Sequence, residues 1–175
     1  RGRGRARGRC ALSDSILVAG VGDIFQGDDA FGVEVARALA QREGVRLRPD
    51  VRVVDFGTRG YDLALALLDA PALAILVDTV QRGEAPGTLY VIDPSVDALA
   101  APADPHSMHP ANVLALVAAL GGTPPRVLIV GCEPLRFATD EEPCPGLSAP
   151  VAAAIPGAVE LVEKVIGSHE ARAHA

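Results

Sequence analysis

Short apolar runs alternate with amphipathic segments along most of the chain. The runs lie at residues 16–19, 51–54, 73–77, 88–92 and 126–131, each short enough for a buried strand. Apolar residues at helical spacing occupy about residues 33–40, 61–68, 113–120 and 147–166. Strands and helices that alternate in this way form a sheet with helices on both faces. We therefore predict an α/β fold: a three-layer doubly wound sheet of five strands.

One connection departs from this alternation. Fewer than a dozen residues separate Asp78, at the end of the third run, from the run at 88–92. A crossover between parallel strands needs a dozen or more residues, usually with a helix. We therefore expect the fourth strand to be antiparallel in an otherwise parallel sheet.

Composition supports a single domain of this kind. Apolar residues make up 49% of the 175 residues, but aromatic residues make up only 3% and Trp is absent. A core of Val, Leu, Ile and Ala suits a sheet that is buried on both faces. We expect one domain at residues 15–167, with an Arg-rich disordered tail at 1–14 and a second disordered tail at 168–175.

Charge and cysteine content narrow the function classes. The net charge is −6 although five of the first nine residues are Arg, so the remainder is acidic and unsuited to wrapping nucleic acid. The three cysteines lack CxxC spacing and fit a reducing compartment. No apolar run approaches the roughly 18 residues of a membrane span, and no signal-peptide core is evident. We expect a cytoplasmic monomer without a membrane or nucleic-acid partner.

Three residues that can bind a metal ion follow predicted strands or precede a helix. Doubly wound sheets place their sites outside the carboxyl ends of the strands. Asp29 follows the first strand, Asp78 ends the third, and His106 lies in the loop before the third helix. Two carboxylates and an imidazole suit zinc, nickel or iron. Three protein ligands would leave positions open for substrate or water.

Each of these residues also has a structural interpretation. Either Asp28 or Asp29 is expected to be a helix N-cap, because a carboxylate there accepts free backbone N–H groups. Asp78 could equally cap a turn. His109 competes with His106, although it directly precedes Pro110, which suits the first position of a helix.

Two other kinds of site are less well supported. Gly20-x-Gly22 begins like a dinucleotide-binding fingerprint, but Phe25 stands where the third glycine belongs. The acids at 28 and 29 would repel a pyrophosphate at that helix start. Cys132 ends a strand and could act as a nucleophile, yet no feature of the sequence singles out a base for it.

Five segments in order resemble the nickel–iron hydrogenase maturation endopeptidases, over about residues 15–167. They are residues 16–33 (ILVAGVGDIFQGDDAFGV), 55–60 (DFGTRG), 76–78 (LVD), 105–116 (PHSMHPANVLAL) and 146–148 (GLS). The resemblance implies an endopeptidase that removes the C-terminal peptide of the nickel–iron hydrogenase large-subunit precursor after nickel insertion. Its mechanism would be aspartyl-type or metal-dependent.

The resemblance also implies roles for individual residues. Asp29, Asp78 and His106 would contact nickel that the substrate carries, so the protein would hold no resident cofactor; a different alignment replaces His106 with His109. Asp55, Gly57 and Thr58 would help to recognise the substrate.

Two questions remain open at this level. Asp23 replaces the family's usual Asn, which either alters metal preference or makes the same turn contacts. The same three metal-contacting residues would also suit a non-catalytic nickel metallochaperone or sensor for hydrogenase assembly.

Overall fold

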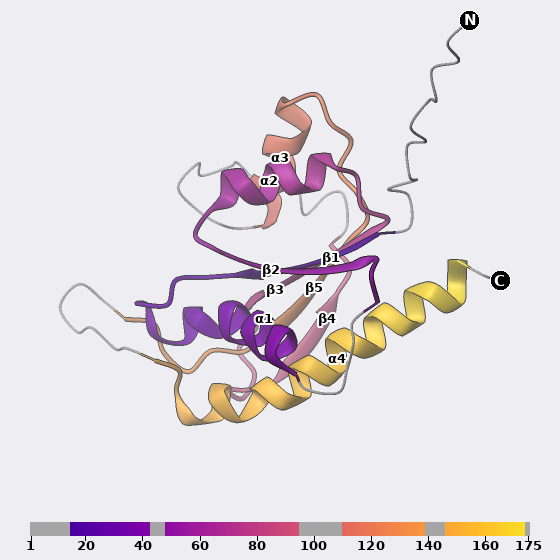
Figure 1. Ribbon diagram of the computed structural model, residues 1–175. Helices are drawn as coiled ribbons and strands as arrows, with labels where there is room; N and C mark the ends of the chain where they lie inside the picture. Colours follow the sequence, from indigo (N-terminus) through magenta and orange to yellow (C-terminus); the bar gives the residue numbers. More distant parts are fainter. Residues whose placement is uncertain (1–14, 43–47, 95–109, 139–145, 174–175) are drawn as a thin grey trace, which may run out of the picture.

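The computed structural model describes residues 15–42, 48–94, 110–138 and 146–173. Within these residues, five strands form one sheet in the order β2-β1-β3-β5-β4, which lies between two layers of helices (Figure 1). The strands are β1 (Ile16–Val21), β2 (Val51–Gly57), β3 (Leu73–Thr79), β4 (Leu89–Ile92) and β5 (Val127–Cys132). The predicted three-layer α/β fold is confirmed.

The helices are divided between the two faces of the sheet. They are the short 3₁₀ turn η2 (Gly27–Ala30) and the helices α1 (Phe31–Gln41), α2 (Gly60–Leu68), α3 (Pro110–Ala119) and α4 (Ala149–Ala173). Helices α1 and α4 cover one face, and α2 and α3 cover the other (Figure 1). Pro110 begins α3, as expected. The predicted end of the last helix is wrong, because α4 continues through Ala173 and most of the expected C-terminal tail is helical.

Strand directions agree with the connection lengths. Strand β1 pairs in parallel with β2 and β3, and β3 pairs in parallel with β5. Strand β4 pairs with β5 in the antiparallel direction, with Tyr90 opposite Gly131. The short connection after Asp78 therefore has the predicted effect, and the carboxyl ends of β1, β2, β3 and β5 share one edge.

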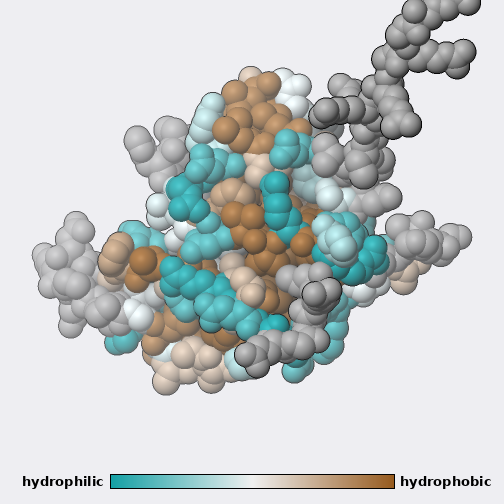
Figure 2. Space-filling model, viewed as in Figure 1, coloured by the Kyte–Doolittle hydropathy of each residue, from teal (hydrophilic) through white to brown (hydrophobic). Residues whose placement is uncertain are grey.

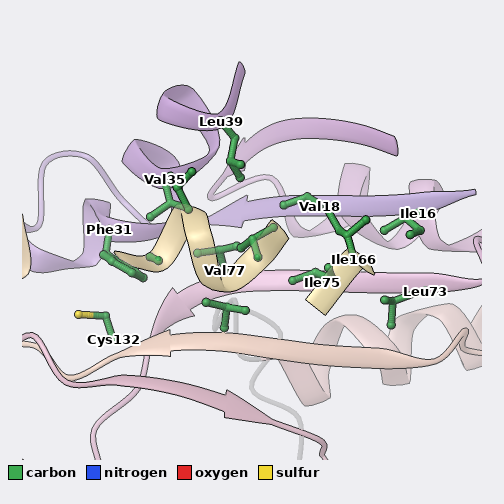
Figure 3. Close-up of a cluster of buried hydrophobic side chains, with 14 of the residues drawn as sticks. Ile16, Val18, Phe31, Val35, Leu39, Leu73, Ile75, Val77, Cys132 and Ile166 are labelled. Carbon is green, nitrogen blue, oxygen red and sulfur yellow. The ribbon is translucent and has the colours of Figure 1, made fainter. Parts of the chain in front are cut away.

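Side chains that alternate along the central strands supply two separate cores. Ile16, Val18, Ile75 and Val77 pack toward α1 and α4 (Figure 3). The intervening residues of β1 and β3 pack toward α2 and α3. Both strands are thus buried on both faces, as expected of the interior of a parallel sheet. Among the described residues, no helix is long and apolar enough to cross a bilayer.

Glycines allow the start of α1 to lie directly on the strand backbones. A Cβ atom on Gly32 would lie 2.0 Å from the carbonyl oxygen of Val77 and 2.3 Å from that of Val21. A Cβ on Gly20 would lie 2.4 Å from the carbonyl oxygen of Gly32. This close approach holds η2, and Asp29 within it, over the carboxyl ends of β1 and β3.

Candidate active site

Asp29 and Asp78 meet at the carboxyl edge of the sheet. The hydroxyl of Thr79 donates a hydrogen bond to Oδ1 of Asp29 at 3.3 Å, and the Thr79 backbone N–H donates to Oδ1 of Asp78 at 2.7 Å. Asp29 comes from η2 and Asp78 from β3, so two elements 49 residues apart in sequence form this pair. The structure therefore brings together the two carboxylates that topology places at this edge.

The pair is electrostatically unfavourable without a cation. Burial of Asp78, followed by the negative charge of Asp29, raises the pKa of the Asp78 carboxyl to about 7, although the hydrogen bond from the Thr79 backbone N–H opposes the shift. Like charges at close range and removal from water both disfavour ionisation. A divalent cation would remove that penalty, because its charge stabilises both carboxylates.

The third expected metal ligand is not visible at this site. His106 and its competitor His109 lie outside the described residues. Within the described ranges, no group of three or more His, Cys, Asp and Glu side chains is arranged to hold a metal ion. The described part of the site is thus the Asp29–Asp78 pair.

The turn between β1 and η2 aims Asp29 at this edge. Gly22 has a φ of 128°, and a Cβ there would lie 1.8 Å from the carbonyl oxygen of Asp29. The backbone N–H of Asp23 donates to Oδ2 of Asp29 at 2.6 Å. The Asp23 carboxylate accepts from the N–H of Phe25 at 2.9 Å and from the Gln26 amide at 3.3 Å. Of the two roles considered for Asp23, turn contacts are the one that the structure displays.

Asp28 has a different role from its neighbour, and the expected N-cap is wrong. Among the described residues, no side chain caps η2 or α1, because η2 runs directly into α1 and both acids lie inside the helical segment. The Asp28 side chain is fully buried and accepts four hydrogen bonds from described residues. Their donors are Ser148 N–H (2.6 Å), Ser148 Oγ (2.9 Å), Leu135 N–H (2.8 Å) and Arg136 N–H (2.9 Å). Asp28 thereby ties the loop after β5 and the start of α4 to the turn that carries Asp29.

Replacing Asp28 with Asn is expected to lower the free energy of unfolding by about 2 to 3 kcal/mol at pH 7. Burial alone would raise the pKa of Asp28, but hydrogen bonds from Ser148, Arg136 and Leu135 outweigh it and hold the pKa below its ordinary value. This contribution to stability is present above the unfolded-state pKa and is lost as pH falls through the folded-state pKa. Urea unfolding at several pH values measures both effects.

The control for this prediction is Asp69→Asn, since the Asp69 side chain is 64% exposed. We expect it to unfold like the wild type at every pH. A variant Asp28→Asn that matched the wild type at pH 7 would show that the four hydrogen bonds contribute no net stability.

Glu133 is a second buried acid, which sequence reasoning missed. It is 4% exposed and accepts hydrogen bonds from the N–H groups of Arg82 (2.9 Å) and Gly83 (3.1 Å) and from the Tyr90 hydroxyl (2.7 Å). The Tyr90 hydroxyl is the main cause that lowers the pKa of Glu133. Glu133 thus anchors the loop that follows Asp78 and Thr79. The sequence feature that could have identified Glu133 is its position just after the fifth predicted strand.

Cys132 does not have the properties of a nucleophile. Burial, with a further contribution from the charge of Asp28, raises the pKa of the Cys132 thiol to about 11. A thiol with that pKa is almost entirely protonated near neutral pH, and the thiolate is the reactive form. Cys132 instead packs in the core cluster that α1 and α4 cover (Figure 3).

The segment expected to contact substrate lies on the same edge. Strand β2 continues past Val54 to Gly57, whose carbonyl oxygen accepts from the N–H of Gly22 at 3.1 Å. The Asp55 carboxylate forms an ion pair with Arg37 at 3.5 Å, and Thr58 is exposed. This segment therefore borders the turn that leads to Asp29.

Together, the mixed five-stranded sheet and the carboxylates at its edge define an α/β protein with an acidic site. Residues 33–165 match the HycI family model, described as hydrogenase maturation protease. The chain therefore belongs to the hydrogenase maturation protease family, and the resemblance noted in the sequence is confirmed.

Individual relatives agree with this assignment. The hydrogenase 2 maturation protease of Escherichia coli K12 is 36% identical over 150 residues, which span 84% of this chain and 87% of the relative. The hydrogenase expression/formation protein HupD of Rhizobium leguminosarum is 32% identical over 156 residues, which span 87% of this chain and 74% of HupD. The structure of the hydrogenase maturating endopeptidase HybD from E. coli superposes with a TM-score of 0.73 and 30% identity, covering 88% of this chain and 93% of HybD.

Proposed function

We propose that this protein is an endopeptidase that removes the C-terminal peptide of a nickel–iron hydrogenase large-subunit precursor after nickel insertion. The observation that carries the proposal is the Asp29–Asp78 pair, bridged by Thr79, in a chain of the hydrogenase maturation protease family. The precursor is the protein partner, and the reaction takes place in the cytoplasm with the protease as a monomer.

Nickel is part of the substrate in this proposal. The precursor's cysteines hold the ion, and Asp29, Asp78 and His106 complete its coordination, with His106 preferred to His109. Oxygen and nitrogen donors suit divalent nickel, and its charge relieves the repulsion between the two carboxylates. A precursor without nickel offers no ion for these residues to bind, so cleavage occurs only after nickel insertion.

The chemistry assigned to the site is hydrolysis of one peptide bond. Bound nickel can polarise the scissile carbonyl or activate a water molecule. Alternatively, one of the two aspartates takes a proton from the attacking water as general base. Asp55, Gly57 and Thr58 border the site and are assigned to substrate recognition, because an extended segment there can hold the peptide beside the Asp29 turn.

The test compares nickel-loaded and nickel-free precursor after incubation with the protein. We expect intact-mass spectrometry to show loss of a short C-terminal peptide from the loaded precursor alone. Transfer of nickel without loss of mass would overturn the proposal in favour of a metallochaperone. Trimming of both samples at equal rates would overturn the role of nickel.

A further inference from the structure

Four large apolar side chains are exposed on two neighbouring loops at the carboxyl edge of the sheet. Ile24 (40% exposed) and Phe25 (76%) precede η2, while Leu135 (55%) and Phe137 (37%) follow β5. The chain has only four phenylalanines, and these two are exposed while the other two are buried. We call these four residues the apolar lip. Figure 2 shows apolar atoms in brown at several places on this face of the molecule, including the side to which β1 runs in Figure 1.

The two halves of the apolar lip are fixed beside each other. The buried Asp28 carboxylate accepts from the N–H groups of Leu135 and Arg136, and the Asp28 N–H donates to the Arg136 carbonyl at 3.2 Å. The Ala138 N–H also donates to the Gln26 carbonyl at 3.4 Å. These bonds hold both loops in place before any partner arrives. A surface ordered in advance loses less conformational entropy on binding.

The lip is also coupled to the candidate active site. The N–H of Phe25 bonds to the Asp23 carboxylate, and the N–H of Asp23 bonds to the Asp29 carboxylate. One short turn therefore carries both an exposed aromatic side chain and a member of the aspartate pair. A chain whose scissile bond lay at Asp29 would pass next to Phe25.

We propose that the apolar lip binds an apolar segment of the hydrogenase precursor that flanks the scissile bond. This inference rests on the proposed function. Aromatic side chains such as Phe are enriched at protein interfaces, and the fully buried centre of an interface is more apolar than the rest of the surface. The four exposed apolar side chains favour an apolar segment, and the carboxylates of Asp23 and Asp29 in the same turn would repel an acidic one.

The test uses the variants Phe25→Ser and Leu135→Ser, with Leu120→Ser as the matched control. Leu120 is 43% exposed and follows α3, toward the opposite edge of the sheet. Thermal unfolding first establishes that all three variants fold. Binding of nickel-loaded precursor is then measured by biolayer interferometry, and trimming is followed by intact mass. We expect each lip variant to raise Kd and KM about tenfold, with the effect on KM rather than kcat, and the control to match the wild type.

The outcomes separate this inference from the proposed function. If the wild type trims the precursor and the lip variants bind it as tightly as the wild type, the lip assignment is wrong and the function stands. If the wild type binds but does not trim, the function is wrong and the binding data alone decide the role of the lip. If the wild type neither binds nor trims, both are overturned. Weakened self-association in place of weakened precursor binding would identify a second copy of this chain as the occupant and overturn the inference.

Discussion

The variant Gly32→Ala is expected to lose more than about 4 kcal/mol of folding free energy and to accumulate as insoluble protein. A Cβ atom there would lie 2.0 Å from the Val77 carbonyl oxygen and 2.3 Å from the Val21 carbonyl oxygen. Both oxygens belong to the backbone of central strands, so they cannot move aside as the end of a flexible side chain could. Either α1 lifts from the sheet, or the pairing of β1 with β3 is distorted.

The matched control is Gly167→Ala. Gly167 lies in α4, and a Cβ added there meets no atom of the part of the chain that the structure describes within 4 Å. Alanine restricts the unfolded chain and favours helix, so this variant should gain about 0.5 to 1 kcal/mol. Soluble yield and thermal unfolding of the two variants provide the measurement. A soluble Gly32→Ala variant that melted within a few degrees of the wild type would contradict the close packing of α1 on the strands.

The variant Asp78→Asn is expected to stop trimming of nickel-loaded precursor, with a fall in rate of about 10² to 10⁴. Asparagine keeps the shape of the side chain but removes the charge that would bind nickel or accept a proton. The same variant should be more stable than the wild type at neutral pH, since it removes a half-buried negative charge that faces Asp29. A catalytic residue held in an unfavourable environment is expected to show this opposition between activity and stability.

The pH dependence of unfolding distinguishes this explanation from general damage to the fold. Because the pKa of Asp78 is about 7 in the folded chain and 3.8 in a model peptide, the folded state retains a proton that the unfolded state loses. As pH rises from about 4 to about 7, the wild type should therefore lose more stability than Asp78→Asn loses. Thermal unfolding across this range measures the difference, with Asp69→Asn as the exposed control. Loss of activity together with a lower melting temperature at pH 7 would show that Asp78→Asn acts by damaging the fold.

Local patterns in the sequence were enough to predict the sheet. Each strand appears as a short apolar run, and the length of the connection after Asp78 gives the direction of β4 without any knowledge of tertiary contacts. Topology then places Asp29 and Asp78 on one edge, because parallel strands β1 and β3 end there together. The role of Gly32 was not predicted, since close contact between a helix and two strand backbones leaves no pattern beyond the glycine itself.

The roles of Asp28 and Glu133 depend on residues that are distant in sequence. The rule for helix N-caps considers the next few residues only, whereas Asp28 finds its partners in Leu135, Arg136 and Ser148, more than 100 residues away. Glu133 likewise accepts from Arg82 and the Tyr90 hydroxyl. A buried carboxylate can be recognised only when the loops that supply its N–H donors are in place. The preference for His106 over His109 stays a prediction from the resemblance.

In the proposed reaction, Asp29, Asp78 and His106 complete the coordination of nickel that the precursor carries. The measurement that tests this coordination is nickel K-edge X-ray absorption of loaded precursor, alone and rapidly frozen after mixing with this protein. We expect oxygen and nitrogen neighbours to join the sulfur ligands of the nickel in the complex. The added oxygen contribution should decrease when Asp29→Asn replaces the wild type. A nickel spectrum that did not change when the complex formed would show that these residues do not bind the substrate's nickel.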